Sequence, residues 1–200
     1  MGNLGDYRDR YAISTWHYVA SPLEDALRGI AAAGFKWVEM WGDKAHLDPR
    51  IHPDMRAIGH LLGRLGLRVH SIHAPFSGLD LGLPGGARKA DAQRVIGDAL
   101  ELGAALGATL AVIHVSSHGE DLQESARYCE SGRVVEDLVH SLLQVAGRTG
   151  VGLALENLPP EANRRYFGCC LQELAAIFPD PSVGFCLDIG HAILHGVSIA

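Results

Sequence analysis

The segment Leu153-Ala154-Leu155-Glu156-Asn157 is a short apolar run that ends at a carboxylate, and Phe185-Cys186-Leu187-Asp188-Ile189-Gly190-His191 is another. Apolar runs of this length, bounded by glycine or proline, are typical of strands buried on both faces of a sheet. A carboxylate at the last position of such a strand lies at the rim of the sheet, where α/β folds place their chemistry. Two rim carboxylates near His191 therefore predict a hard-metal or acid–base site.

Strand and helix patterns alternate along the whole chain around these two segments. Ser21 is the expected N-cap of the first helix, with Glu24 completing a capping box. Four glycines each end a helix and lead directly into a strand: Gly34, Gly66, Gly107 and Gly150. We expect strands at 11–16, 35–40, 67–72, 109–114, 151–156 and 183–188, and helices at 22–33, 54–65, 87–106, 132–148 and 171–178. Repeated βα units with short turns predict a parallel sheet, open or closed into a barrel.

The residues that follow the first strand distinguish an open Rossmann sheet from a barrel. A Rossmann domain would carry G-x-G-x-x-G after it, but here the strand is followed by Trp16-His17-Tyr18. Polar residues instead close six successive strands, which is typical of the C-terminal face of a (β/α) barrel: His17, Glu39, His73, His114, Glu156 and Asp188. We therefore predict an α/β fold in which residues 1–200 are one barrel domain. A closed barrel needs eight strands, so we expect a fragment lacking the last two βα units; the alternative is a partial barrel completed by another chain.

Composition limits the classes of partner. The chain has 17 Lys and Arg against 23 Asp and Glu, a net charge of −6, and no basic run, which disfavours nucleic acid. No apolar stretch reaches membrane-spanning length and no signal-peptide pattern opens the chain, so we expect a cytoplasmic protein without a membrane partner. Its four cysteines form no C-x-x-C motif. We expect His46, His52 and His60 at the surface, and a homo-oligomer is left open.

Motifs at four strand ends carry a resemblance to a known family: Ser71-Ile72-His73-Ala74-Pro75, Ile113-His114, Leu155-Glu156-Asn157 and Leu187-Asp188-Ile189-Gly190-His191-Ala192. They resemble the xylose isomerase-like TIM-barrel superfamily, which includes sugar and sugar-phosphate isomerases and epimerases, hydroxypyruvate isomerases, inosose dehydratases and endonuclease IV. The resemblance covers essentially the whole chain. It is specific for the superfamily, through the D-I-G-H-A string, and not for one activity.

The resemblance implies a set of metal ligands. In the isomerases and epimerases of that superfamily, four residues near the ends of strands five to eight hold a divalent ion. Glu156 and Asp188 match the first two, and His191 matches a histidine that contacts substrate oxygens. The other two ligands, a histidine and a glutamate, belong to strands that this sequence lacks. Endonuclease IV relatives bind further metal ions through histidines after strands three and four, which His73 and His114 match, so a multi-zinc site is also open.

These ligand types indicate the chemistry. Carboxylates suit Mg²⁺ or Mn²⁺, and added imidazoles shift the preference towards Mn²⁺, Co²⁺ or Zn²⁺. A divalent ion bound by two neighbouring substrate oxygens polarises a carbonyl and acidifies the adjoining carbon. A carboxylate then moves the proton through an enediol, and the resemblance implies Glu156 as both ligand and base. The alternative for Glu156 and Asp188 is a structural role, bonded to nearby loop amides.

Residues around the predicted rim complete the candidate site. Trp16, His17, Trp41 and Phe76 are expected to form an aromatic wall against the apolar face of a sugar, or else ordinary packing under the loops. His73 and His114 are expected to contact substrate or metal, or to be hydrogen-bonded without either. Glu39 matches a rim glutamate of the superfamily and would orient a ligand histidine.

The segment after the fifth strand separates subclasses of the superfamily. Asn157 is expected to hold the following loop, Leu158-Pro159-Pro160-Glu161. Sugar epimerases of the superfamily often carry a further glutamate in a distinctive segment here, and Glu161 is a weak match. This mismatch weighs against a ketose 3-epimerase.

Three hypotheses follow. The leading one is a divalent-metal-dependent isomerase or epimerase of a small sugar, sugar phosphate or related hydroxy-carbonyl compound. The second is a zinc phosphodiesterase like endonuclease IV, which the acidic charge disfavours. The third is a barrel that binds a small ligand without turnover, or an inactive fragment.

Overall fold

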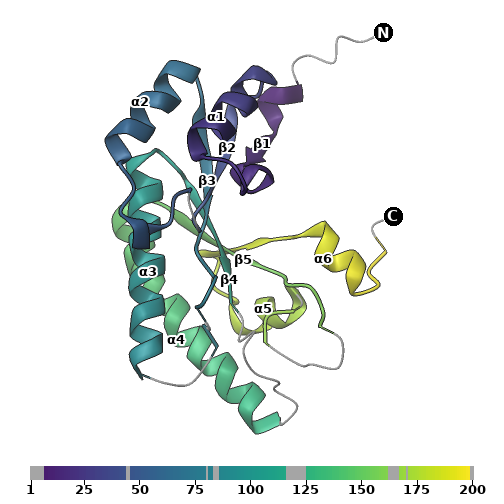
Figure 1. Ribbon diagram of the computed structural model, residues 1–200. Helices are drawn as coiled ribbons and strands as arrows, with labels where there is room; N and C mark the ends of the chain where they lie inside the picture. Colours follow the sequence, from purple (N-terminus) through teal and green to yellow (C-terminus); the bar gives the residue numbers. More distant parts are fainter. Residues whose placement is uncertain are drawn as a thin grey trace.

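The computed structural model describes residues 7–198 apart from 44–45, 80, 83–85, 116–124, 162–166 and 170. Six parallel strands form one sheet in the order of the chain (Figure 1). They are β1 (Ala12–Ser14), β2 (Trp37–Trp41), β3 (Arg68–His73), β4 (Leu110–His114), β5 (Gly152–Glu156) and β6 (Val183–Cys186). Helices follow the strands in alternation: α1 (Leu23–Ala32), α2 (Met55–Leu65), α3 (Gly86–Ala105), α4 (Ser125–Thr149), α5 (Leu171–Ile177) and α6 (Ile189–Leu194). Among the described strands, β1 and β6 are the two edges, so the sheet is open. Six parallel strands in chain order are what the predicted partial barrel requires, and that prediction is confirmed.

The strands divide their side chains between two faces. Ile72, Ile113 and Leu155 are fully buried in the core under the helices. The residue after each of them is polar, and because side chains alternate along a strand, that residue lies on the opposite face. The period-2 pattern thus puts the apolar side under α3 and α4 (Figure 1) and leaves His73, His114 and Glu156 for the inner face.

The predicted helix ends are confirmed. Gly34, Gly66, Gly107 and Gly150 all have left-handed backbone, with φ between 67° and 85°. This conformation strains residues with a Cβ and lets the chain turn out of the helix into the next strand. Four of the short αβ connections therefore follow from local backbone chemistry.

The predicted start of the first helix is wrong. Leu23 opens α1, Pro22 occupies the N-cap position, and no side chain caps it. Ser21 is used elsewhere: its N–H donates to the Tyr18 carbonyl at 2.8 Å and its carbonyl accepts from His46. Glu24 pairs with Arg28 one turn along the helix in place of a capping box. A competing turn from the preceding 3₁₀-helix, Thr15–Tyr18, thus takes the cap residue.

Other boundaries shift for similar reasons. α4 begins at Ser125, before the expected position 132, and Gly132 lies within the helix beside the Phe167 ring. β6 ends at Cys186, and Asp188 is the N-cap of α6, where its Oδ1 accepts from the His191 N–H at 2.7 Å. A carboxylate expected to end a strand therefore opens a helix.

His46 is buried, with 2% of its surface exposed, so its expected surface position is wrong. Its Nε2 lies 3.0 Å from the Ser21 carbonyl, which can only accept, and therefore carries the proton. Nδ1 then accepts from the Thr15 hydroxyl at 3.1 Å, while Thr15 Oγ1 accepts from the Trp41 N–H. This satisfied chain joins the ends of β1 and β2. His52 and His60 are exposed as expected.

Within the described ranges, no helix combines the length and apolar character needed to cross a membrane.

Candidate active site

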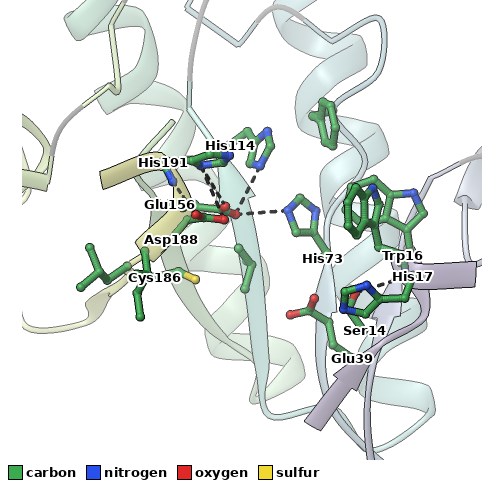
Figure 2. A pocket seen from close by; sticks show the side chains of 16 residues that line it. Ser14, Trp16, His17, Glu39, His73, His114, Glu156, Cys186, Asp188 and His191 are labelled. Carbon is green, nitrogen blue, oxygen red and sulfur yellow. Dashed lines mark hydrogen bonds and ion pairs between the residues drawn. The ribbon is translucent and has the colours of Figure 1, made fainter. Parts of the chain in front are cut away.

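One cavity of about 660 Å³ opens at the C-terminal ends of the strands. All of the predicted site residues line it, although they come from six separate parts of the chain (Figure 2): Trp16, His17, Glu39, His73, His114, Glu156, Asp188 and His191. The order of the strands thus brings these predicted residues to one rim. The lining also includes residues that the sequence did not single out, among them Ser14, Val112 and Cys186.

Glu156 is the centre of the site. Its side chain is 8% exposed, and its Oε2 lies 3.2 Å from His73 Nε2 and 3.3 Å from His114 Nε2. Burial by itself raises the pKa of this carboxyl group. The hydrogen bonds and positive charge of His114 and His73 outweigh burial and lower the pKa to about 2. Glu156 is therefore ionised across the physiological pH range.

The ring of His73 is held in a defined orientation. Its Nδ1 lies 3.0 Å from the Ala74 carbonyl, so Nδ1 carries a proton and Nε2 faces Glu156. Burial lowers the pKa of His73, but the hydrogen bond to Glu156 and the charges of Glu156 and Glu39 more than compensate, so the pKa is raised. The proton on Nε2 is the one that a metal ion would replace.

Asp188 and His191 approach Glu156 from the other side. His191 Nδ1 lies 3.6 Å from Glu156 Oε1 and 3.7 Å from Asp188 Oδ2. The same nitrogen lies 2.8 Å from the Asn157 carbonyl, so it carries a proton and donates there. In the neutral ring the lone pair is then on Nε2, which suits a contact with substrate better than a metal bond through Nδ1.

Asn157 has a role that the sequence reasoning missed. Its side chain donates to the Asp188 carbonyl at 3.0 Å and accepts from the Asp188 N–H at 2.8 Å. It therefore ties the end of β5 to the turn that carries Asp188 and His191, in addition to preceding the 159–160 loop. The only available signal was its position directly after a strand-end carboxylate.

Aromatic rings form a continuous wall beside the carboxylates. Trp41 packs on His73 with ring centroids 4.5 Å apart, and Phe76 stacks on His114 at 4.3 Å. Trp16 continues the wall at 6.4 Å from Trp41 and is 51% exposed towards the cavity mouth. The predicted wall is present, and it also packs the two histidines.

Glu39 accepts a hydrogen bond from Ser71, and within the described residues it makes no hydrogen bond to a histidine. The register between β2 and β3 skips His70, so that Val38 pairs with Val69 but Glu39 pairs with Ser71. This bulge brings the Ser71 hydroxyl within 3.0 Å of Glu39 Oε2, to which it donates. Glu39 acts on His73 through its charge, which raises the pKa of that ring.

Cys186 lines the cavity as a neutral thiol. Burial first, and then the charges of Glu156, Glu39 and Asp188, raise the pKa of this thiol to about 12. A protonated thiol is a poor nucleophile and a poor metal ligand. Cys186 is therefore part of the apolar lining.

The donor atoms fit a divalent cation. Two groups have ligand atoms within 4.8 Å of one another, and Glu156 belongs to both: His73, His114 and Glu156 in one, and Glu156, Asp188 and His191 in the other. Ligands about 2.1 Å from a tetrahedral ion lie about 3.4 Å apart, close to the 3.2 and 3.3 Å found around Glu156 Oε2. The mixture of imidazole and carboxylate is suited to Mn²⁺, Co²⁺ or Zn²⁺.

A sequence profile of the xylose isomerase-like TIM barrel matches residues 27–198. The chain belongs to this family. Among curated proteins, no sequence matches it significantly. The resemblance seen in its strand-end motifs is thus confirmed at the level of the family.

Solved structures of sugar epimerases and of an epimerase-like protein have the same fold. A D-tagatose 3-epimerase-like protein is 22% identical with a TM-score of 0.74, covering 90% of this chain and 65% of its own. L-ribulose 3-epimerase is 21% identical with a TM-score of 0.72, covering 94% and 63%. D-psicose 3-epimerase from Clostridium cellulolyticum H10 is 18% identical with a TM-score of 0.74, covering 94% and 66%. The chain thus spans about two thirds of their length, and at these identities the likeness establishes the fold.

Proposed function

We propose that the protein is a divalent-cation-dependent isomerase or epimerase of a small sugar with a carbonyl next to a hydroxyl-bearing carbon. One observation carries the proposal: Glu156 lies between two imidazoles on one side and Asp188 with His191 on the other. This cluster faces a cavity of about 660 Å³ with an aromatic wall, a volume within the usual range of about 300–1,000 Å³ for small-molecule sites.

Glu156 and Asp188 would hold the cation, and His73 and His114 offer further nitrogen ligands beside Glu156. A bound divalent ion would polarise the substrate carbonyl and acidify the carbon next to it. Trp41 and Trp16 would cover the apolar face of the sugar, and His17 would contact it at the cavity mouth. These roles agree with the residue types and with their places on the wall.

Glu156 would take the proton from the carbon next to the carbonyl, the C–H electron pair would become a C=C bond, and the carbonyl π pair would move to the oxygen to give an enediolate. Protonation of the enediolate at carbon, by the Glu156 carboxyl group or by solvent, would complete the step. In the free protein its low pKa makes it a weak base, because His73 and His114 donate to it. A ligand that engages those two nitrogens removes the donors and makes the carboxylate more basic. His191, whose Nδ1 is held by the Asn157 carbonyl, would accept a hydrogen bond from a substrate hydroxyl at Nε2.

The names of the structural neighbours support this class, since two are 3-epimerases, of L-ribulose and D-psicose, and one is a D-tagatose 3-epimerase-like protein. Glu161, the weak match to a further epimerase glutamate, is described in the structure and does not line the cavity. We therefore propose proton transfer next to a carbonyl and leave the position on the sugar to the experiment.

Proton transfer can be tested by exchange with solvent. The chain is incubated with Mn²⁺ in D₂O with D-tagatose, L-ribulose, D-psicose or D-fructose, and NMR follows the replacement of C–H by C–D next to the carbonyl. We expect exchange with at least one sugar and a fall of about 10²–10⁴-fold in Glu156→Gln. The matched control Glu101→Gln changes an exposed glutamate on α3 and keeps the exchange rate. Absence of exchange in a folded, Mn²⁺-bound protein, or full exchange in Glu156→Gln, would reject the proposal.

A zinc phosphodiesterase is the second candidate, and the short contacts of His73 and His114 with Glu156 favour it. The net charge of −6 disfavours a nucleic-acid substrate. Nicking of an abasic DNA duplex with Zn²⁺, abolished in His114→Ala, would support this candidate. If the protein binds Mn²⁺ or a sugar but neither exchanges protons nor cleaves DNA, both enzyme proposals fail and a barrel that binds a small ligand without turnover is supported.

A further inference from the structure

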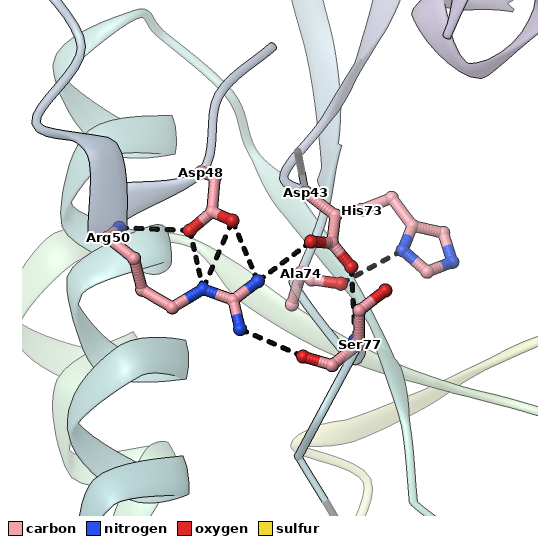
Figure 3. A network of polar contacts seen from close by, with 6 residues as sticks. All are labelled: Asp43, Asp48, Arg50, His73, Ala74 and Ser77. Carbon is pink, nitrogen blue, oxygen red and sulfur yellow. Dashed lines mark hydrogen bonds and ion pairs between the residues drawn. The ribbon is translucent and has the colours of Figure 1, made fainter. Parts of the chain in front are cut away.

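The loop that follows β2 holds an ionic cluster of two buried carboxylates and a partly exposed arginine (Figure 3), none of which lines the cavity. The Arg50 guanidinium donates to both carboxylate oxygens of Asp48 through Nε, at 2.8 and 3.0 Å. Its Nη2 donates to Asp48 Oδ2 and to Asp43 Oδ1, both at 2.7 Å. Asp43 and Asp48 are only 2% and 4% exposed. One arginine thus binds two buried carboxylates from its own loop.

This cluster is hydrogen-bonded to the loop that follows β3. Arg50 Nη1 donates to the Ser77 carbonyl at 2.8 Å, and Asp43 Oδ2 accepts from the Ser77 N–H at 3.0 Å. Both backbone polar groups of Ser77 are therefore bound by the same ionic cluster (Figure 3). The planar guanidinium makes these bonds at fixed angles, which a lysine ammonium does not reproduce.

The segment from Ala74 to Ser77 contributes to two parts of the candidate active site. Phe76, next to Ser77, stacks on His114, and the Ala74 carbonyl accepts the proton of His73 Nδ1. On the other side, the Gly42 N–H donates to the His73 carbonyl at 2.8 Å. A Cβ on Gly42 would lie 2.3 Å from that carbonyl oxygen, so the loop after β2 approaches the end of β3 as closely as a glycine allows.

The physical reason for a charged cluster here is geometry. Removing charges from water costs several kcal/mol per ion, so well-packed apolar residues often stabilise a fold as well as a buried ion pair does. What the bidentate arginine adds is a defined direction and distance. The pKa of Arg50 is raised, first through its hydrogen bond to Asp48, so the charge persists at all physiological pH values.

We propose that Arg50, together with Asp43 and Asp48, is a positioning clamp that orients His73 and Phe76 by fixing Ser77. None of the three lines the cavity. The clamp acts on the face of Glu156 that meets His73 and His114, and its catalytic consequence rests on the proposed function. The orientation of His73 is a property of the free protein and does not rest on it.

The test compares Arg50→Lys and Arg50→Gln with Arg94→Gln. Arg94 also binds two aspartates, Asp91 and Asp98, but it is 60% exposed on α3 and serves as the matched control. The first readout is NMR of ¹⁵N-histidine-labelled protein, in which His73→Asn assigns the Nδ1–H signal. The second is Mn²⁺ affinity by calorimetry, and the third is the thermal midpoint.

We expect both Arg50 variants to lose protection of the His73 Nδ1–H against solvent exchange and to bind Mn²⁺ at least about tenfold more weakly. Arg94→Gln should change neither. If the Arg50 variants only melt earlier, with the His73 signal and its protection unchanged, the clamp is a stability element and the proposal is overturned. If Arg50→Gln does not fold, Asp43→Asn, which keeps the side-chain volume, gives the same comparison. If the wild type binds no Mn²⁺, the proposed function fails, while the His73 signal still decides the clamp.

Discussion

Replacing Glu156 by Gln in the metal-free protein should produce a pH-dependent loss of stability. The pKa of Glu156 falls from its ordinary value of 4.5 to about 2 in the folded protein. At about 1.36 kcal/mol per pKa unit, this corresponds to about 3 kcal/mol. Because the folded pKa is the lower one, the contribution is present above pH 4.5 and is lost as the pH falls towards 2. Glutamine keeps the shape and cannot carry the charge.

Histidine sets the upper limit of this pH window. The pKa of His73 is raised above 6.5, first through its hydrogen bond to Glu156, so the contribution of His73 is complete below pH 6.5 and is lost as the pH rises through the folded value. The wild type should therefore exceed Glu156→Gln most clearly between pH 4.5 and 6.5. Because the shift of Glu156 already includes its interaction with His73, the two contributions are not added, and the total stays at about 3 kcal/mol.

Urea unfolding in EDTA, followed by circular dichroism from pH 2.5 to 8, measures this difference. With an m-value of about 3 kcal/mol/M, the midpoints should differ by about 1 M near pH 5.5 and converge at the acid end. Glu101→Gln is the control and should follow the wild type, since Glu101 is exposed on α3. A midpoint difference that stays constant between pH 2.5 and 5.5 would refute the assignment of the low pKa to Glu156 beside His114 and His73.

Three further changes test the local geometry. Gly42→Ala should lower both the thermal midpoint and the rate of proton exchange, because its Cβ would lie 2.3 Å from the His73 carbonyl oxygen. Gly59→Ala is the control and should be neutral or stabilising, since nothing lies within 4 Å of its Cβ. Equal melting curves for the two variants would contradict the close approach at Gly42. Asn157→Ala should cost about 1–3 kcal/mol in urea unfolding, because it leaves the backbone N–H and carbonyl of Asp188 without their partner. A variant with wild-type stability and Mn²⁺ affinity would show that this link is dispensable. In differential scanning calorimetry, Mn²⁺ at about 100 times its Kd should raise the thermal midpoint by about 5–10 °C, and Asp188→Asn should remove most of that rise. An undiminished rise in Asp188→Asn would exclude Asp188 as a ligand.

Much of the fold could be predicted because its signals are local. Left-handed glycines end the helices, apolar runs mark the strands, and a parallel βα series places every strand's carboxyl end at one rim. These rules brought Glu156 and His73 to one cavity without any contact being known. The errors occurred where a residue had a local and a distant partner, as when Ser21 left the helix cap for a turn and for His46.

The sequence by itself determined the order of the elements and the residue types at the rim, since strand periodicity and helix-ending glycines act within a few positions. Only the tertiary structure decided how those residues are held. His46 is buried because Thr15 and Ser21 offer it partners from another loop, and Arg50 reaches Ser77 across two connections. Such hydrogen bonds depend on ångström-scale distances between segments far apart in the chain, and no local pattern records those distances.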